Sequence, residues 1–241
     1  MEKRKVLFIR EVTSINTTFY DTIKNDIQNI VSNERKNFEQ RCIPLPISYS
    51  EFCDLFVSFG TYYLFRQNQN VGFVIDERNE SIIKQLFLYL IRDSSFEGNL
   101  HKGIMLQGKF GCGKTAIMGT YSLIHNHIIQ RFGVRIPLVT FIKSVHLQEQ
   151  IVKRTISSFV YRPLIIDEFG RESKAVQDFG NILRPVSELL SVRSDNSSLT
   201  HGTTNFTLET LSSENFYGGM IGDRLKMMFN FITLHGESRR R

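Results

Sequence analysis

The sequence predicts an α/β protein in which helices flank a parallel sheet that carries a phosphate-binding loop. Short apolar runs alternate with helix-like segments through most of the 241 residues, an arrangement typical of parallel α/β sheets. A glycine-rich loop, Gly108 to Thr115, stands between one such run and the next helical segment. Further along, the apolar run Leu164 to Ile166 ends in two acids.

The first 70 residues differ from the rest and are expected to form a small helical module. Phe19 to Phe38 and Ser50 to Phe65 both have helical spacing of apolar residues. The aromatic residues of the second segment are interpreted as core, with a base-stacking surface as the alternative. The polar stretch Gln67 to Asn70 marks the expected boundary, which gives a helical module over 1–70 and a nucleotide-binding domain over 71–241.

Within the second domain, five strands are expected to form one parallel sheet with helices on both faces. Asn79 is expected to cap a helix whose apolar residues share one face. Phe73 to Ile75 should form a short strand or an extended segment. The five expected strands cover 103–107, 137–142, 163–167, 199–204 and 229–234, and the later helices cover 114–130, 146–154 and 181–192.

Composition indicates a water-soluble globular protein. Hydrophobic residues make up 41% of the chain and charged residues 22%, and no apolar run reaches the length of a membrane span. The apolar segment after the basic N-terminus is too short for a signal peptide, so the cytoplasm is the expected compartment. Three cysteines are too few for a disulfide framework or a zinc site. The net charge of +6 suits a polyanion such as nucleic acid, or reflects a merely basic surface.

The glycine-rich loop matches the P-loop pattern G-x-x-x-x-G-K-[ST], with an apolar strand before it and an apolar helix after it. Its glycines allow backbone N–H groups to face a phosphate chain, which also meets the positive end of the following helix. Lys114 is expected to reach the β- and γ-phosphates of ATP, and Thr115 to ligate Mg²⁺. The side chains of Lys109 and Cys112 serve as spacers. The residues expected to bind ATP are Gly108, Gly111, Cys112, Gly113, Lys114, Thr115 and Ala116.

Two acids end the buried strand, at the edge where open parallel sheets bind ligands. Asp167 is expected to hold Mg²⁺ through water. Glu168 is expected to orient and polarise the water that attacks the γ-phosphate, and the alternative is a helix-start residue in a solvated loop. A second acid beside the first favours hydrolysis of ATP over phosphoryl transfer to a small molecule.

Taken in order along the chain, these motifs resemble those of AAA+ ATPases of the bacterial helicase-loader type, the DnaC and IstB-like group. The resemblance rests on Gly108 to Thr115, Leu164 to Gly170, Thr203-Thr204-Asn205, Gly222 to Leu225 and the tail Gly236 to Arg240. It runs from Phe73 to the C-terminus and does not include the first 70 residues. It implies an AAA+ core without a C-terminal lid domain, and homo-oligomers whose active sites are shared between subunits.

The resemblance also implies roles for polar residues beyond the P-loop and the two acids. Asn205 is similar to sensor 1, which hydrogen-bonds the attacking water or the γ-phosphate; a strand-end cap is the alternative. Arg224 is similar to an arginine finger that reaches the γ-phosphate of a neighbouring subunit. The alternative there is a surface arginine paired with Asp223. Arg240 aligns with the sensor 2 arginine, with Arg239 as the other candidate and a basic tail as the alternative.

Single-stranded DNA and a second protein are the partners that the resemblance implies. The region between Ile142 and Pro163 is expected to hold a helix that contacts DNA, with Lys143, Lys153 and Arg154 as candidate phosphate contacts. The segment Tyr217 to Met220 lacks the further arginine that loader-type proteins often carry before the finger.

The leading hypothesis is an ATPase, with ATP and Mg²⁺ at its site, that assembles on single-stranded DNA and delivers a replicative helicase or a transposase. The N-terminal module should bind that partner, because an AAA+ core does not need it. One alternative is an ATP-binding switch with negligible turnover. The other is a small-molecule kinase, which predicts an arginine-rich lid and a pocket for the acceptor substrate. The sequence has instead Glu168 after Asp167 and a sensor-like Asn205.

Overall fold

Two compact units make up the chain in the computed structural model, Met1–Ile43 and Pro44–Arg241, and each is described by itself. The structure describes residues 19–33, 47–133, 137–178 and 181–239. In the first unit, residues 19–33 form a helix, as expected, and residues 34–38 of the expected helix lie outside the described residues. The apolar side chains of this helix, among them Ile23 and Ile27, are exposed.

A five-stranded parallel sheet forms the centre of the second unit, as the sequence predicts. Its strands are β1 (Gly103–Gln107), β2 (Thr140–Lys143), β3 (Leu164–Phe169), β6 (Thr200–Thr204) and β7 (Phe229–Thr233). They are ordered β2-β3-β6-β1-β7, and every neighbouring pair is parallel. The carboxyl ends of all five strands therefore lie at one edge, where open α/β sheets place their ligands.

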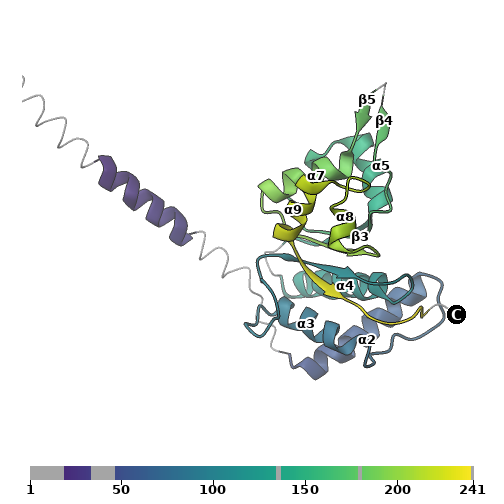
Figure 1. Cartoon of the computed structure of the whole chain (residues 1–241). Coiled ribbons are helices and arrows are strands. Elements are labelled where there is room, and N and C mark those ends of the chain that lie inside the picture. The colour runs from purple at the N-terminus through teal and green to yellow at the C-terminus, as the bar shows by residue number, and fades with distance from the viewer. Residues whose placement is uncertain (1–18, 34–46, 134–136, 179–180, 240–241) are drawn as a thin grey trace, which may run out of the picture. The chain divides into compact units, whose positions relative to one another are not determined.

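Helices cover both faces of this sheet (Figure 1). On one side lie α2 (Tyr49–Arg66), α3 (Glu80–Leu90) and α4 (Lys114–Phe132). On the other lie α5 (Ser144–Arg154), α7 (Pro185–Asp195), α8 (Leu208–Leu211) and α9 (Gly219–Met228), with the short α6 (Ser157–Val160) against α5 and α7. Within the described ranges, no helix is long and apolar enough to cross a membrane.

Helix α2 belongs to the second unit, so that unit begins before the boundary expected at residue 70. A capping box starts the helix: the side chains of Ser48 and Glu51 each accept a hydrogen bond from the other residue's backbone N–H. Along α2, the ring of Tyr63 lies so close to Gly119 of α4 that a Cβ at Gly119 would overlap it. Glycine in a helix interior destabilises the helix by roughly 1 kcal/mol relative to alanine. Gly119 is nevertheless required in α4, because the ring of Tyr63 leaves no room for a side chain there.

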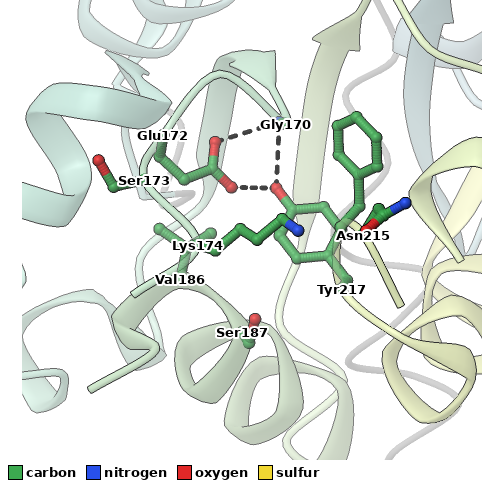
Figure 2. Close-up of a pocket in the computed structure, with 9 residues that line it drawn as sticks. Gly170, Glu172, Ser173, Lys174, Val186, Ser187, Asn215 and Tyr217 are labelled. Atoms are coloured by element: carbon green, nitrogen blue, oxygen red, sulfur yellow. Dashed lines mark hydrogen bonds between the residues drawn. The ribbon is translucent and has the colours of Figure 1, made fainter. Parts of the chain in front are cut away.

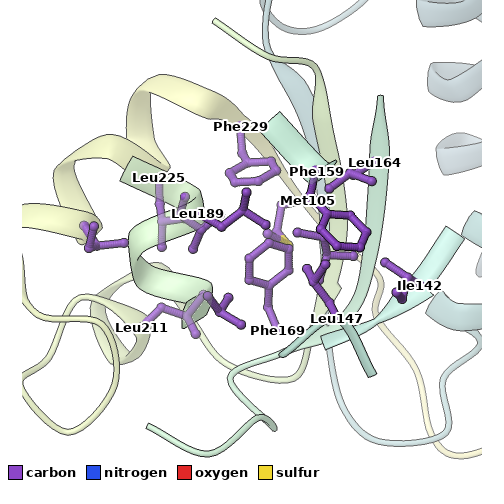
Figure 3. Packing of buried hydrophobic residues seen from close by; sticks show 14 of the residues in the cluster. Met105, Ile142, Leu147, Phe159, Leu164, Phe169, Leu189, Leu211, Leu225 and Phe229 are labelled. Atoms are coloured by element: carbon purple, nitrogen blue, oxygen red, sulfur yellow. The ribbon is translucent and has the colours of Figure 1, made fainter. Parts of the chain in front are cut away.

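The main hydrophobic core lies between the sheet and the layer that contains α5, α7 and α9 (Figure 3). Fully buried leucines come from each of these helices, namely Leu147, Leu189 and Leu225. On the other side of the sheet, Phe52 and Phe56 of α2 are also fully buried. Phe52 and Phe56 are therefore core, which agrees with the interpretation of this aromatic cluster from the sequence, whereas Tyr62 and Phe65 of the same cluster are exposed.

Three local features differ from the expected elements. Asn79 precedes α3 without a side-chain cap; its Oδ1 accepts from the Asp76 N–H at 2.9 Å instead. Of the two alternatives expected for Phe73 to Ile75, the strand is the one that does not form. The helix expected over 181–192 begins only at Pro185, because proline is tolerated in the first turn of a helix and not in its interior. Before it comes an antiparallel hairpin of β4 (Val176–Asp178) and β5 (Asn181–Leu183), which the sequence pattern does not predict.

Candidate ATP and magnesium site

The glycine-rich loop connects β1 to α4 at the carboxyl edge of the sheet. Gly111 and Gly113 have φ angles of +78° and +112°, a region that residues with a Cβ disfavour. At Gly111 a Cβ would also overlap Ser238, so glycine there allows the C-terminal tail to approach the loop. Cys112 is buried, as suits a spacer, and Ala116 lies in the first turn of α4. The loop thus has the backbone that the P-loop motif predicts.

Lys114 reaches back over this loop. Its Nζ donates to the carbonyl oxygens of Gly108 and Lys109 at 2.8 and 2.7 Å, and to Asn205 Oδ1 at 2.8 Å. Burial lowers the pKa of the Lys114 ammonium from its usual value. The structure therefore brings Asn205, at the end of β6, into direct contact with the lysine expected to bind phosphate.

Asp167 is buried between hydroxyl groups from two elements. Its Oδ1 accepts hydrogen bonds from Thr115 Oγ1 at 2.9 Å and from Thr203 Oγ1 at 2.6 Å. Its Oδ2 is buried and has no hydrogen-bond partner among the described residues. Burial raises the pKa of Asp167, and the hydrogen bonds from Thr203 and Thr115 oppose that shift.

These oxygens fit a magnesium ion. Carboxylate and hydroxyl oxygens are the ligands that Mg²⁺ prefers, and it commonly takes only one or two protein side chains together with substrate phosphates and water. Asp167 Oδ2 is a buried acceptor with unused capacity, beside the Thr115 hydroxyl. In the part of the chain that the structure describes, no group of three or more His, Cys, Asp or Glu side chains could hold a metal. A site of the P-loop type, completed by phosphates, is the arrangement that fits.

Glu168 lies next to Asp167, but its carboxylate faces two cations. Arg171 Nη1 donates to Oε1 at 2.7 Å, and Lys143 Nζ lies 4.0 Å from Oε2. The backbone N–H of Glu168 donates to Thr203 Oγ1 at 2.9 Å. Arg171 therefore occupies one of the two carboxylate oxygens of Glu168.

Three residues contact the two acids in a way that the sequence did not predict: Thr203, Arg171 and Lys143. Thr203 contacts both acids, and its signal in the sequence is its place in the Thr203-Thr204-Asn205 motif, two residues before Asn205. Arg171 follows Glu168 by three residues, a spacing that carries no signal outside a helix. Lys143 was noted only as a possible DNA contact.

The C-terminal tail runs alongside the loop. The Arg239 N–H donates to the Gly111 carbonyl at 3.0 Å, and the guanidinium donates to Asp76 Oδ1 at 2.7 Å. The hydrogen bond from Arg239 lowers the pKa of Asp76. Arg240, the first candidate for sensor 2, lies outside the described residues, whereas the other candidate, Arg239, lies beside the phosphate-binding loop.

Arg224 lies on α9 and is held within its own chain. Its guanidinium pairs with Asp195, the last residue of α7, and donates to the Ser191 carbonyl at 3.2 Å. Its partner is therefore Asp195 and not Asp223. Among the described residues, no hydrogen bond or ion pair joins Arg224 to the phosphate-binding loop. An arginine finger would act on a neighbouring subunit, so this role stays a prediction.

The three candidate DNA contacts lie at the two ends of α5. Lys143 precedes the helix, whereas Lys153 and Arg154 form its last turn and are exposed. A helix of 11 residues is ~16 Å long. Lys143 is therefore separated from the other two by about the length of the helix.

Comparisons with known proteins bear on the fold. No protein-family model and no curated protein matches this chain. A protein from Streptococcus pyogenes serotype M3, described as a candidate primosome component, has a similar structure, with a TM-score of 0.50 and 18% identity over 70% of this chain and 85% of that chain. DnaI (TM-score 0.48, 21% identity, 71% of this chain and 88% of that chain) also matches. So does the DnaC helicase loader (TM-score 0.48, 15% identity, 68% and 93%). The sheet order and the first of these likenesses confirm that the second unit has the P-loop AAA+ fold that the sequence predicts.

Proposed function

We propose that this chain is a Mg²⁺-dependent ATPase that assembles on single-stranded DNA and delivers a partner protein, such as a replicative helicase or a transposase. The observation that carries the ATPase part is the convergence of Lys114, Asn205, Thr115 and Asp167 at the carboxyl edge of the sheet. The DNA and the delivered partner are supported by the basic net charge of +6 and by the resemblance of the motifs to helicase loaders.

Each side chain has a distinct task in this proposal. Lys114 exchanges its two carbonyl contacts for the β- and γ-phosphates of ATP. Thr115 and Asp167 hold Mg²⁺, which supplies positive charge to the phosphates. Asn205 donates its amide to the γ-phosphate or to the attacking water, and Glu168 polarises that water.

One observation favours a second function, an ATP-binding switch with negligible turnover. Arg171 and Lys143 both face the Glu168 carboxylate, and the hydrogen bond from Arg171 occupies Oε1, one of the two oxygens that could accept a proton from an attacking water. ATP turnover, measured with and without single-stranded DNA, separates the two functions. A loader-type ATPase turns over and responds to DNA, whereas a switch binds ATP and does neither.

Two substitutions separate binding from hydrolysis. Lys114→Ala should remove most of the ATP affinity, because it deletes the ammonium group that lies against the backbone of the phosphate-binding loop. Glu168→Gln should keep ATP binding and lose hydrolysis, because the phosphate and magnesium contacts remain. Lys109→Ala is the matched control, since that side chain belongs to the same loop and is 76% exposed. Wild-type turnover in Glu168→Gln would refute the catalytic assignment.

DNA binding has its own signature. Affinity for single-stranded DNA should rise with a non-hydrolysable ATP analogue and fall steeply with salt, because phosphate contacts release counterions. The double variant Lys153→Ala/Arg154→Ala should weaken binding and flatten the salt dependence, whereas Lys84→Ala on α3 serves as a surface control. Undetectable or salt-independent binding at ~50 mM salt removes nucleic acid from the function.

A mixing experiment tests whether active sites are shared between subunits. Glu168→Gln keeps Arg224 but has a dead pocket, whereas Arg224→Ala has an intact pocket and offers no finger. An inserted arginine is worth roughly 10³–10⁵ in rate in related enzymes, so each variant alone should be nearly inactive and the mixture should recover activity. If the two variants assemble together and the mixture stays inactive, Arg224 does not act on a neighbour.

Partner binding is assigned to the N-terminal part of the chain. Because α2 packs on the ATPase domain, the candidate segment is residues 1–43 and not 1–70. Its helix over 19–33 presents exposed apolar side chains, which suits a protein contact. Deleting residues 1–43 should leave ATP turnover intact and abolish delivery of the partner; loss of turnover would contradict this division of labour.

A further inference from the structure

Tyr217 and Glu172 form a hydrogen-bonded pair just beyond the two acids (Figure 2). The Tyr217 hydroxyl donates to Glu172 Oε1. The backbone N–H of Gly170 donates to Glu172 Oε2 at 3.1 Å and to the Tyr217 oxygen at 3.2 Å. Both side chains therefore accept a hydrogen bond from the N–H of Gly170, which lies two residues after Glu168.

The turn that contains this N–H sets the direction of Glu168. Glu168 has a φ of +63° and Gly170 a φ of +86°, and the pairing of β3 with β6 is irregular at this point. A positive φ is uncommon for a residue with a side chain and persists only where the surroundings hold it. The Arg171 N–H closes the turn by donating to the Glu168 carbonyl at 3.1 Å. The orientation of the Glu168 carboxylate thus depends on contacts that hold residues 168–172.

Packing alone leaves this turn room to move. A cavity of about 210 Å³ lies beside it, and Gly170, Glu172 and Tyr217 are among the residues that line it (Figure 2). Lys174 and the first turn of α7 border the same cavity. Phe206 and Leu211 pack closely against one side of Gly170. On the side of the cavity, the hydrogen bonds to the Gly170 N–H are the contacts that hold the turn.

A purely structural role would not require a polar pair here. Replacing both partners of a hydrogen bond by apolar groups of the same shape can be nearly neutral for stability. A hydrogen bond is directional, however, and a carboxylate that accepts from both a phenol and an N–H fixes their relative positions. Tyr217 is itself anchored, because its N–H donates to the Leu211 carbonyl at 3.0 Å and its ring packs edge-on against Phe169.

We infer that Tyr217 and Glu172 are positioning residues for Glu168: they hold the 168–172 turn so that the Glu168 carboxylate is aimed at the attacking water. The inference rests on the proposed ATPase function and adds two residues to that site. Tyr217 also directly precedes Gly218, the N-cap of α9, so the pair connects the turn to the helix that carries Arg224. Among the described residues, neither side chain hydrogen-bonds to the phosphate-binding loop, Asp167 or Asn205.

The test is Tyr217→Phe, which removes the hydroxyl and keeps the ring. The kcat for ATP should fall about tenfold while the KM and the affinity for ATP change less than twofold. The matched control is Tyr89→Phe, since Tyr89 is also buried and its hydroxyl donates to the Lys102 carbonyl at 2.9 Å. The control should lose comparable thermal stability and keep its kcat.

Substitutions at Glu172 complete the experiment. Glu172→Ala should lower kcat as much as Tyr217→Phe, and the double variant should be no worse than either one, because both act through one contact. Glu172→Gln keeps an acceptor for the Tyr217 hydroxyl and should retain a larger share of kcat than Glu172→Ala. All variants are compared at a temperature where circular dichroism shows them folded.

Failure of the positioning role and failure of the ATPase function give different results in these measurements. If the wild-type chain hydrolyses ATP and Glu168→Gln does not, but Tyr217→Phe keeps its kcat, the inference is overturned and the ATPase stands. A fall in kcat no larger than that of Tyr89→Phe overturns it as well. If the wild-type chain shows no turnover, the proposed function fails and the inference fails with it.

Discussion

Asp167→Asn should stabilise the nucleotide-free protein and at the same time remove the stabilisation that Mg²⁺ adds to ATP binding. Asp167 is 0% exposed, and its Oδ2 has no hydrogen-bond partner among the described residues. Asparagine keeps the oxygen that accepts from Thr115 and Thr203 and removes the buried charge. The substitution therefore relieves a cost that the site bears only while no cation neutralises it.

The size of the stabilisation by Asp167→Asn follows from the burial of Asp167 Oδ2. A buried polar atom without a partner costs about 1–3 kcal/mol. Asparagine still leaves an uncharged polar group at that position. The free energy of unfolding should therefore increase by an amount near the lower limit, ~1 kcal/mol. In a domain of this size 1 kcal/mol shifts Tm by roughly 2–4 °C. Addition of Mg²⁺ and ATP at ~100 times Kd should stabilise the wild-type chain by about 2.7 kcal/mol, and Asp167→Asn by much less.

The pH dependence of this difference has a definite sign. Burial raises the pKa of Asp167 in the folded state above its unfolded value, so the folded state binds the proton more tightly. The resulting stability is fully present below the unfolded pKa and is lost as the pH rises through the folded pKa. The advantage of Asp167→Asn should therefore be largest near neutral pH and shrink toward pH ~4.

Thermal melts of both proteins, with and without Mg²⁺ and ATP, make the measurement. Asp54→Asn is the matched control, because Asp54 is exposed on α2 and should show neither effect. A lower Tm for nucleotide-free Asp167→Asn, or an undiminished response to Mg²⁺, would refute the reasoning.

Two further predictions concern the folded domain. Gly119→Ala should destabilise it by about 1–3 kcal/mol in urea unfolding, because the new methyl group overlaps Tyr63. Gly219→Ala, with no atom within 4 Å of the new group, should be neutral or stabilising, and equal effects would contradict the packing argument. Burial lowers the pKa of His201 to about 3, so the folded state favours the neutral imidazole. The contribution of His201 to the free energy of unfolding is therefore complete above its unfolded pKa and is lost as the pH falls. The loss is roughly 1.4 kcal/mol per pH unit below ~6.5, and His201→Gln should flatten that slope; an unchanged slope would exclude His201 as its source.

The sheet and the phosphate-binding loop could be predicted because local sequence determines them. Apolar runs bounded by polar or glycine residues define the strands, and β1 has the bounds that were expected. The P-loop pattern carries its own backbone requirements, so its glycines and the start of α4 are where the motif predicts them. Asp167 could be placed as well, because it ends a strand at the ligand-binding edge.

The rest depends on side chains that are distant in sequence and meet only in the folded chain. The sequence by itself does not pair Tyr63 with Gly119, and so it places α2 outside the unit that contains the sheet. It also contains no signal that joins Tyr217 to Glu172, 45 residues apart. Periodicity and motifs report on neighbours along the chain, so the candidate site residues can be identified from the sequence. The contacts that orient Glu168 arise from packing between elements, and only the tertiary structure decides them.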